Sequence, residues 1–126
     1  MATDIAAPPG GDRPDDPLLV ACLCAGWCHL CDSYRVTFDA LAAEFGPTCR
    51  WLWVDIEDQA AMLGDLDIET FPTLMLARGD TPLFFGPVTP QPQAARQLVR
   101  RALVGDLGMA SDLALAGLPQ RLRAWR

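Results

Sequence analysis

Four of the chain's five cysteines lie within ten residues, and their spacing could support either redox chemistry or metal binding. Cys22, Cys24, Cys28 and Cys31 form this group, while Cys49 stands apart. An odd number of cysteines is not typical of the disulfide framework of a small secreted domain. In a reducing compartment, clustered cysteines more often indicate a metal site or thiol–disulfide exchange.

The run Trp27-Cys28-His29-Leu30-Cys31 lies where a strand-like pattern gives way to a helical one. Cys28 would then occupy a helix N-terminus, where unpaired N–H groups and the helix dipole stabilise a thiolate. Cys31 follows one turn later on the same face, close enough for a disulfide. We therefore predict that Cys28 is a nucleophile and that Cys31 is its resolving thiol.

The flanking sequence predicts the elements that position this motif. The apolar run at 18–24 indicates a strand buried on both faces, and apolar residues spaced by three and four at 30–45 indicate a helix that ends at Gly46-Pro47. The order strand, helix, strand favours parallel pairing, so we expect an α/β sandwich with helices covering a mixed sheet of about four strands. The other expected strands are at 50–55, 73–77 and 81–85, and the last two form a hairpin. The other expected helices are at 59–66, with Asp58 as N-cap, and at 92–104, opened by Pro92.

The two ends of the chain differ in composition and charge. Residues 1–17 hold almost no large apolar groups, and we expect a flexible leader there, followed by a domain at 18–108. Residues 1–95 carry 4 arginines and 14 acids, a net charge of −10, whereas residues 96–126 carry 6 arginines and 2 acids, a net charge of +4. We expect residues 109–126 to be a basic tail that either packs back as short helices or extends as an arm. This tail could serve as an interaction surface, but neutralising an acidic body is the favoured interpretation.

Composition excludes several classes of function. The net charge of −6 argues against nucleic-acid binding, and no apolar run reaches the ~18 residues of a membrane span. The N-terminus lacks a basic patch followed by an apolar stretch, so we expect no secretory signal and a cytoplasmic location.

Three features in this order resemble the thioredoxin superfamily over roughly residues 18–105. They are the Trp-Cys-x-x-Cys motif, Val54-Asp55 at the end of the next strand, and Phe71-Pro72-Thr73 before the hairpin, with Gly86 after the last strand. The resemblance implies a thioredoxin-like three-layer sandwich and a thiol–disulfide oxidoreductase that acts on protein disulfides without a cofactor. It also implies disulfide-containing protein substrates, and a reductase or thiol pool for recycling.

The resemblance further assigns residues around the motif. In thioredoxin-like folds the proline before the third strand is cis and faces the active-site disulfide, a role that falls here to Pro72. By the same resemblance, Trp27, Phe71, Pro72 and Gly86 would line an apolar surface on which substrates dock.

Departures from the family pattern affect the proton chemistry. The position six residues before Cys28, where thioredoxins carry a buried carboxylate, is Cys22, and the chain has no lysine. Water or an acid from elsewhere would have to accept the proton of the resolving thiol. His29 as an imidazolium would stabilise the Cys28 thiolate and make the disulfide more oxidising than that of thioredoxin; alternatively it faces solvent with little effect.

Two other classes of function compete with this one. Cys22, Cys24, Cys28, His29 and Cys31 offer enough sulfur and nitrogen for zinc or an iron–sulfur cluster. We expect Cys22 and Cys24 to point to opposite faces of their strand, as buried small hydrophobes, which opposes both a metal site and a second redox pair. A thioredoxin-fold interaction module, with the arginines of 96–126 as its docking surface, is the third class.

The remaining candidates receive structural interpretations. Cys49 is expected to have no role in the chemistry. Asp55, Glu57 and Asp58 are expected to form a solvated strand end and a helix cap, although Asp55 could lie near the active-site face. Trp51 and Trp53 alternate with Leu52 and are expected to pack in the core from one face.

Overall fold

The structure is a computed structural model, and it describes residues 17–64, 68, 70–108, 115 and 117–125. Nearly all of the expected leader and part of the expected tail, residues 109–114, 116 and 126, lie outside the described residues. The described elements are β1 (Leu18–Cys24), α1 (His29–Phe45), a 3-10 turn η2 (Gly46–Thr48), β2 (Cys49–Asp55), α2 (Ala60–Leu63), β3 (Thr73–Arg78), β4 (Thr81–Pro87), α3 (Pro92–Leu103) and α4 (Leu118–Trp125).

The four strands form one mixed sheet with the order β2-β1-β3-β4. β1 pairs in parallel with β2, from Leu18 opposite Cys49 to Cys24 opposite Asp55, and antiparallel with β3. β3 and β4 form the antiparallel hairpin at the other edge. The predicted mixed sheet with a parallel crossover is confirmed.

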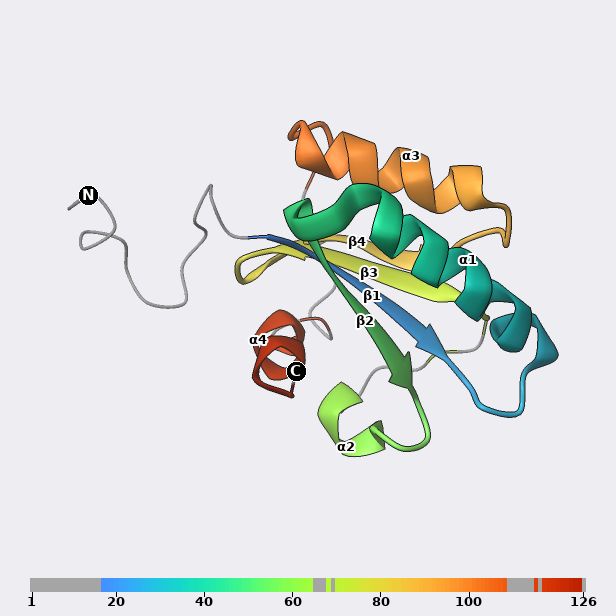
Figure 1. Cartoon of the computed structure of the whole chain (residues 1–126). Coiled ribbons are helices and arrows are strands. Elements are labelled where there is room, and N and C mark those ends of the chain that lie inside the picture. Colours follow the sequence, from blue (N-terminus) through green and yellow to red (C-terminus); the bar gives the residue numbers. More distant parts are fainter. Residues whose placement is uncertain (1–16, 65–67, 69, 109–114, 116, 126) are drawn as a thin grey trace.

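Helices cover both faces of the sheet, as Figure 1 shows, with α1 and α3 on one face and α2 and α4 on the other. Because side chains alternate along a strand, fully buried β1 serves both cores. Its even-numbered residues face α1 and α3, and its odd-numbered residues face α2 and α4. The first set is Leu18, Val20, Cys22 and Cys24, and the second is Leu19, Ala21 and Leu23.

The C-terminal helix α4 lies on the sheet rather than extending as an arm. Leu118 and Leu122 are fully buried in the core on its side of the sheet. Arg121 Nε donates a hydrogen bond of 2.6 Å to Met62 O of α2, and Arg50 donates one of 3.4 Å to Arg123 O. Part of the basic C-terminal segment is therefore engaged inside the domain.

The boundaries of α2 and β4 differ from the prediction. The N-cap of α2 is Gln59 rather than Asp58. Residues 55–59 form a turn before the helix, in which the Asp55 carboxylate accepts hydrogen bonds from the N–H groups of Glu57 and Asp58, and Asp55 O accepts one from the N–H of Gln59. The helix ends at Gly64, whose φ of 63° suits glycine. β4 continues through Pro87 instead of ending at residue 85, which an edge strand tolerates.

No helix within the described ranges has the length and apolar character needed to span a bilayer.

Candidate active site

Cys28 is the N-cap residue of α1, as its position in the sequence predicted. Its backbone is extended, with φ −91° and ψ 116°, and its carbonyl accepts hydrogen bonds from the N–H groups of Cys31 and Asp32 at 3.1 and 3.3 Å. The Cys28 N–H donates to Ala25 O, which closes the turn leaving β1. The side chain is free and half-buried, so its sulfur lies between solvent and the core.

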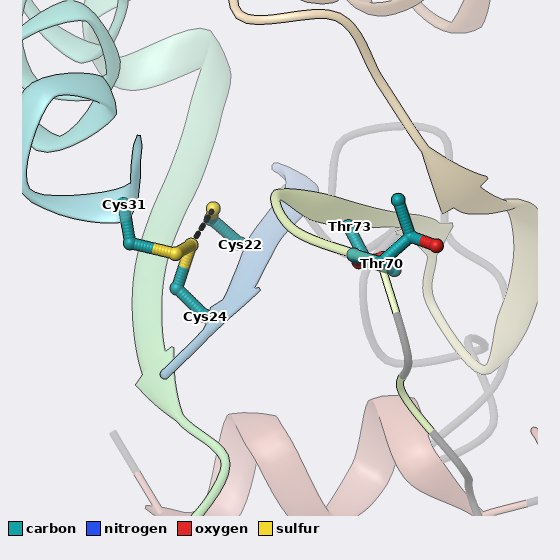
Figure 2. Close-up of a disulfide and its surroundings, with 5 residues drawn as sticks. All are labelled: Cys22, Cys24, Cys31, Thr70 and Thr73. Atoms are coloured by element: carbon teal, nitrogen blue, oxygen red, sulfur yellow. Dashed lines mark hydrogen bonds between the residues drawn. A yellow bond between two sulfur atoms is a disulfide. The ribbon is translucent and has the colours of Figure 1, made fainter. Parts of the chain in front are cut away.

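The partner of Cys31 differs from the prediction. Cys31 forms a disulfide with Cys24, across a Cα–Cα distance of 5.9 Å (Figure 2). Cys28 remains a free thiol. Both bonded residues are buried, with 2% of Cys24 and 1% of Cys31 exposed. The bond joins the end of β1 to the first turn of α1, directly beneath the N-terminus of the helix.

The prediction that Cys22 and Cys24 point to opposite faces is wrong. Both belong to the core between the sheet and α1, and their sulfurs lie 3.9 Å apart (Figure 2). Since a strand repeats every two residues, positions two apart share a face. The predicted opposite orientation was the argument against a second redox pair and against a shared metal site, so neither is excluded on that ground. That periodicity could have placed Cys24 together with Cys22 on the face of β1 that α1 covers.

Cys22 is held in its protonated form. Burial raises the pKa of the Cys22 thiol well above its ordinary value of 9.0, although the positive charge of Arg35 opposes this shift. Because Cys24 has no proton while it is bonded to Cys31, Cys22 is the donor in the contact between their sulfurs. The buried Tyr34 hydroxyl, which has no hydrogen-bond partner among the described residues, also has a raised pKa, from burial and then from Cys22.

An apolar surface adjoins Cys28. Trp27 is 64% exposed, and its ring meets the edge of the Phe71 ring at a centroid distance of 5.5 Å. Leu30, which the apolar spacing placed on the same helix face as the buried Tyr34 and Phe38, is instead exposed on the first turn of α1. The motif and the loop before β3 therefore contribute to one surface.

The loop before β3 contains a cis peptide bond between Phe71 and Pro72, as the resemblance implied. Thr73 Oγ1 donates to Thr70 O at 2.6 Å, and Val88 N donates to Pro72 O at 3.0 Å, which ties the loop to the end of β4. Because Thr73 pairs with Leu23 in the sheet, Pro72 comes beside the end of β1 that carries Cys24. Gly86, the remaining predicted docking residue, lies in β4 opposite Leu74, two residues beyond Pro72.

The sequence model of a known family, described as Thioredoxin, matches residues 12–89. This chain belongs to the thioredoxin family. Together with the disulfide, this membership makes it a thiol–disulfide oxidoreductase in general class. No curated protein matches the sequence.

Solved thioredoxin structures share its fold. The thioredoxin Deadhead of Drosophila melanogaster has a TM-score of 0.62 at 19% identity, covering 70% of this chain and 83% of that one. The thioredoxin of Trypanosoma brucei brucei has a TM-score of 0.57 at 26% identity, covering 72% and 79%. A chain of the complex between ferredoxin:thioredoxin reductase and thioredoxin f2 has a TM-score of 0.61 at 14% identity, covering 71% and 80%.

Asp55 is the acidic residue that the sheet brings to the cysteines of this thioredoxin-family site. It pairs with Cys24 across β1 and β2. Its Oδ2 lies beside the turn that leads to Cys28, since a Cβ built on Gly26 would come within 3.0 Å of that oxygen. The acidic cluster thus lies at the strand end, as predicted, but does not cap α2, and its first member also borders the redox motif.

The remaining predicted residues are His29, the two tryptophans of β2 and Cys49. His29 is exposed at the first position of α1, and its effect on the neighbouring thiolate stays a prediction. Trp51 and Trp53 pack edge-on against Phe38 on the α1 face, at 5.1 and 5.5 Å, which confirms their shared face. Cys49 is buried at the opposite end of the sheet, paired with Leu18.

A metal site built from the cysteine cluster would need sulfurs that the disulfide occupies. Cys24 and Cys31 are bonded to each other, so neither can supply a thiolate ligand in this state. The structure therefore shows the cluster engaged in disulfide chemistry.

Proposed function

We propose that this protein exchanges disulfides with protein substrates through Cys28 as nucleophile and Cys31 as resolving thiol. The observation that carries the proposal is the position of Cys28: a half-buried thiol at the N-cap of α1, one turn before buried Cys31 and beside exposed Trp27. Such a sulfur can reach a disulfide on a partner, while the buried one can react only with groups already held in the site.

The reaction then proceeds in two exchanges. The Cys28 thiolate attacks one sulfur of the substrate disulfide, forming a mixed disulfide and releasing the other substrate sulfur as a thiolate that takes up a proton. Cys31, after losing its proton, attacks Cys28 Sγ and releases the second substrate thiolate. The substrate gains two electrons and two protons, and the enzyme is left with one disulfide. The reverse sequence oxidises a substrate dithiol.

The surface beside Cys28 favours polypeptide substrates. Exposed Trp27 and Leu30 flank the sulfur with apolar area, and Phe71 supports the Trp27 ring from the side. An apolar rim of this kind binds extended chain segments around a disulfide better than it binds a small polar thiol. Replacing Trp27 with alanine should therefore raise KM for a protein disulfide and leave the rate with a small polar disulfide such as hydroxyethyl disulfide unchanged.

A reductase is the proposed source of electrons. One solved relative is a chain from a complex of ferredoxin:thioredoxin reductase with thioredoxin f2, which supports a redox enzyme of this kind as a partner. A low-molecular-weight dithiol can replace it in an assay.

The decisive test is turnover of a protein disulfide such as insulin with a dithiol as reductant. Cys28→Ser should abolish turnover, and Cys31→Ser should accumulate mixed disulfides with the substrate. Cys49→Ser, which also removes a buried thiol but lies at the start of β2, opposite Leu18 at the far end of the sheet, is the matched control and should retain activity. Full activity of Cys28→Ser would refute the proposal.

A further inference from the structure

Cys31 has two neighbouring thiols with which it can form a disulfide. Cys28 lies three residues before it at the start of the same helix, and Cys24 lies across from it at the end of β1, where the structure contains the bond. We propose that Cys24 is a second catalytic thiol, which replaces Cys28 as the disulfide partner of Cys31 after each oxidation. The functional consequence rests on the proposed exchange at Cys28.

The step is an exchange within the oxidised protein. The Cys24 thiolate attacks Cys31 Sγ, so that the Cys24–Cys31 bond forms and the Cys28–Cys31 bond breaks. The electron pair of the broken bond leaves with Cys28 Sγ, which stays a thiolate or takes the proton that Cys24 lost. One disulfide is present before and after, so no external oxidant or reductant is needed.

Local geometry supports each part of this step. Cys31 is bonded to Cys24 of β1, and Cys28 is the N-cap residue of the helix that carries Cys31, three residues and less than one turn before it. Cys22 donates to Cys24 Sγ at 3.9 Å, so it can stabilise a negative charge there when the Cys24–Cys31 bond is absent. Burial keeps Cys22 protonated, as its raised pKa shows, which suits it as a donor rather than as a competing nucleophile.

The exchange leaves the reactive thiol outside and the disulfide inside. With Cys24 bonded to Cys31, the half-buried sulfur of Cys28 is free, whereas both bonded residues are almost wholly buried. With Cys28 bonded to Cys31, the three remaining thiols, Cys22, Cys24 and Cys49, are all buried. The two oxidised forms therefore differ in whether an accessible thiol exists.

That difference can be measured by alkylation under native conditions followed by mapping. The protein is oxidised with diamide, freed of it, labelled with iodoacetamide and digested with chymotrypsin without reduction. Cleavage after Leu23, Trp27, Leu30 and Tyr34 places Cys24, Cys28 and Cys31 on separate peptides. Trypsin would leave all three on one peptide, because the neighbouring arginines are Arg13 and Arg35.

The wild-type protein should yield a Cys24–Cys31 linked peptide pair and label on Cys28. In Cys24→Ala the linked pair should contain Cys28 and Cys31, with loss of the Cys28 label. Cys49→Ala, the matched control, should behave as the wild type. A Cys28–Cys31 pair with no label on Cys28 in the wild-type protein would overturn the inference, whether or not the variants fold.

The same mapping separates this inference from the proposed function. If insulin turnover requires Cys28 while the wild-type protein shows only the Cys28–Cys31 pair, the proposed function stands and the exchange to Cys24 is wrong. If turnover does not require Cys28 but the Cys24–Cys31 pair is found, the proposed function is wrong and the internal disulfide is a structural bond.

Discussion

Removing Cys24 should make the disulfide of this protein more oxidising. The oxidised wild-type protein can distribute between two bonds, Cys24–Cys31 and Cys28–Cys31, whereas Cys24→Ala retains only the second. Every additional form of the oxidised state stabilises that state relative to the reduced one. The reduction potential of the wild-type protein should therefore be more negative than that of the variant.

The size of the shift follows from the ratio of the two bonds. The structure contains the Cys24–Cys31 bond, which marks it as the favoured form; we illustrate the shift with a ratio of about ten to one, equivalent to about 1.4 kcal/mol. The oxidised state is then stabilised by a factor of roughly eleven, which for a two-electron couple is about 30 mV, or about 1.4 kcal/mol. The chymotryptic mapping measures the ratio, and the predicted shift is then calculated from the measured value.

The assay is equilibration in glutathione buffers of graded ratio, followed by acid quenching, alkylation and mass measurement. Cys49→Ala serves as the control for losing a buried thiol and should keep the wild-type potential. Equal potentials for the wild-type protein and Cys24→Ala, in a protein whose mapping shows mostly Cys24–Cys31, would refute the reasoning. They would mean that the internal bond does not exchange with Cys28.

Three further predictions concern the scaffold. Leu122→Ala should cost about 2–5 kcal/mol in chemical denaturation, because its side chain is fully buried between α4 and the sheet; a loss within experimental error would mean that α4 does not pack there. Gly26→Ala should lower the free energy of unfolding by about 1 kcal/mol, since the new Cβ would lie 3.0 Å from Asp55 Oδ2. In a double-mutant cycle, adding Asp55→Ala should remove most of this loss, and purely additive effects would contradict the contact. The free energy of unfolding should fall by up to about 1.4 kcal/mol per pH unit as pH rises above about 9, because the unfolded chain loses the Cys22 proton that the folded chain keeps. Denaturation at pH 8 and pH 10 measures this slope. Cys22→Ala should reduce it, and an unchanged slope would contradict the prediction.

Periodicity in the sequence was enough to predict the sheet, its parallel crossover and the helix that begins at the motif. The same rule, applied correctly, places Cys22 and Cys24 on one face of β1, the face that α1 covers. The choice of Cys24 rather than Cys28 as partner of Cys31 was beyond the sequence. It depends on how closely α1 packs against β1. The packing of the whole core sets this spacing, which is 5.9 Å between the Cα atoms of Cys24 and Cys31.

The C-terminal segment shows a second limit of sequence reasoning. Apolar residues at helical spacing, including Leu118 and Leu122, were visible, but a helix and an arm remained alternatives. The deciding factor is the sheet, whose second face needs a cover that four-residue α2 cannot supply alone. Deleting residues 109–126 would consequently expose that core. A loss of partner binding after such a deletion would report unfolding as readily as a lost docking surface.

His29 and Cys24 act on the redox potential in opposite directions. An imidazolium at His29 would stabilise the Cys28 thiolate of the reduced protein and raise the potential. The bond to Cys24 stabilises the oxidised protein and lowers it. A wild-type potential at or below that of thioredoxin therefore does not by itself exclude an effect of His29. His29→Ala must be compared with its parent in the Cys24→Ala background, where the potential should fall if the imidazolium acts on Cys28 and stay unchanged if it faces solvent without effect.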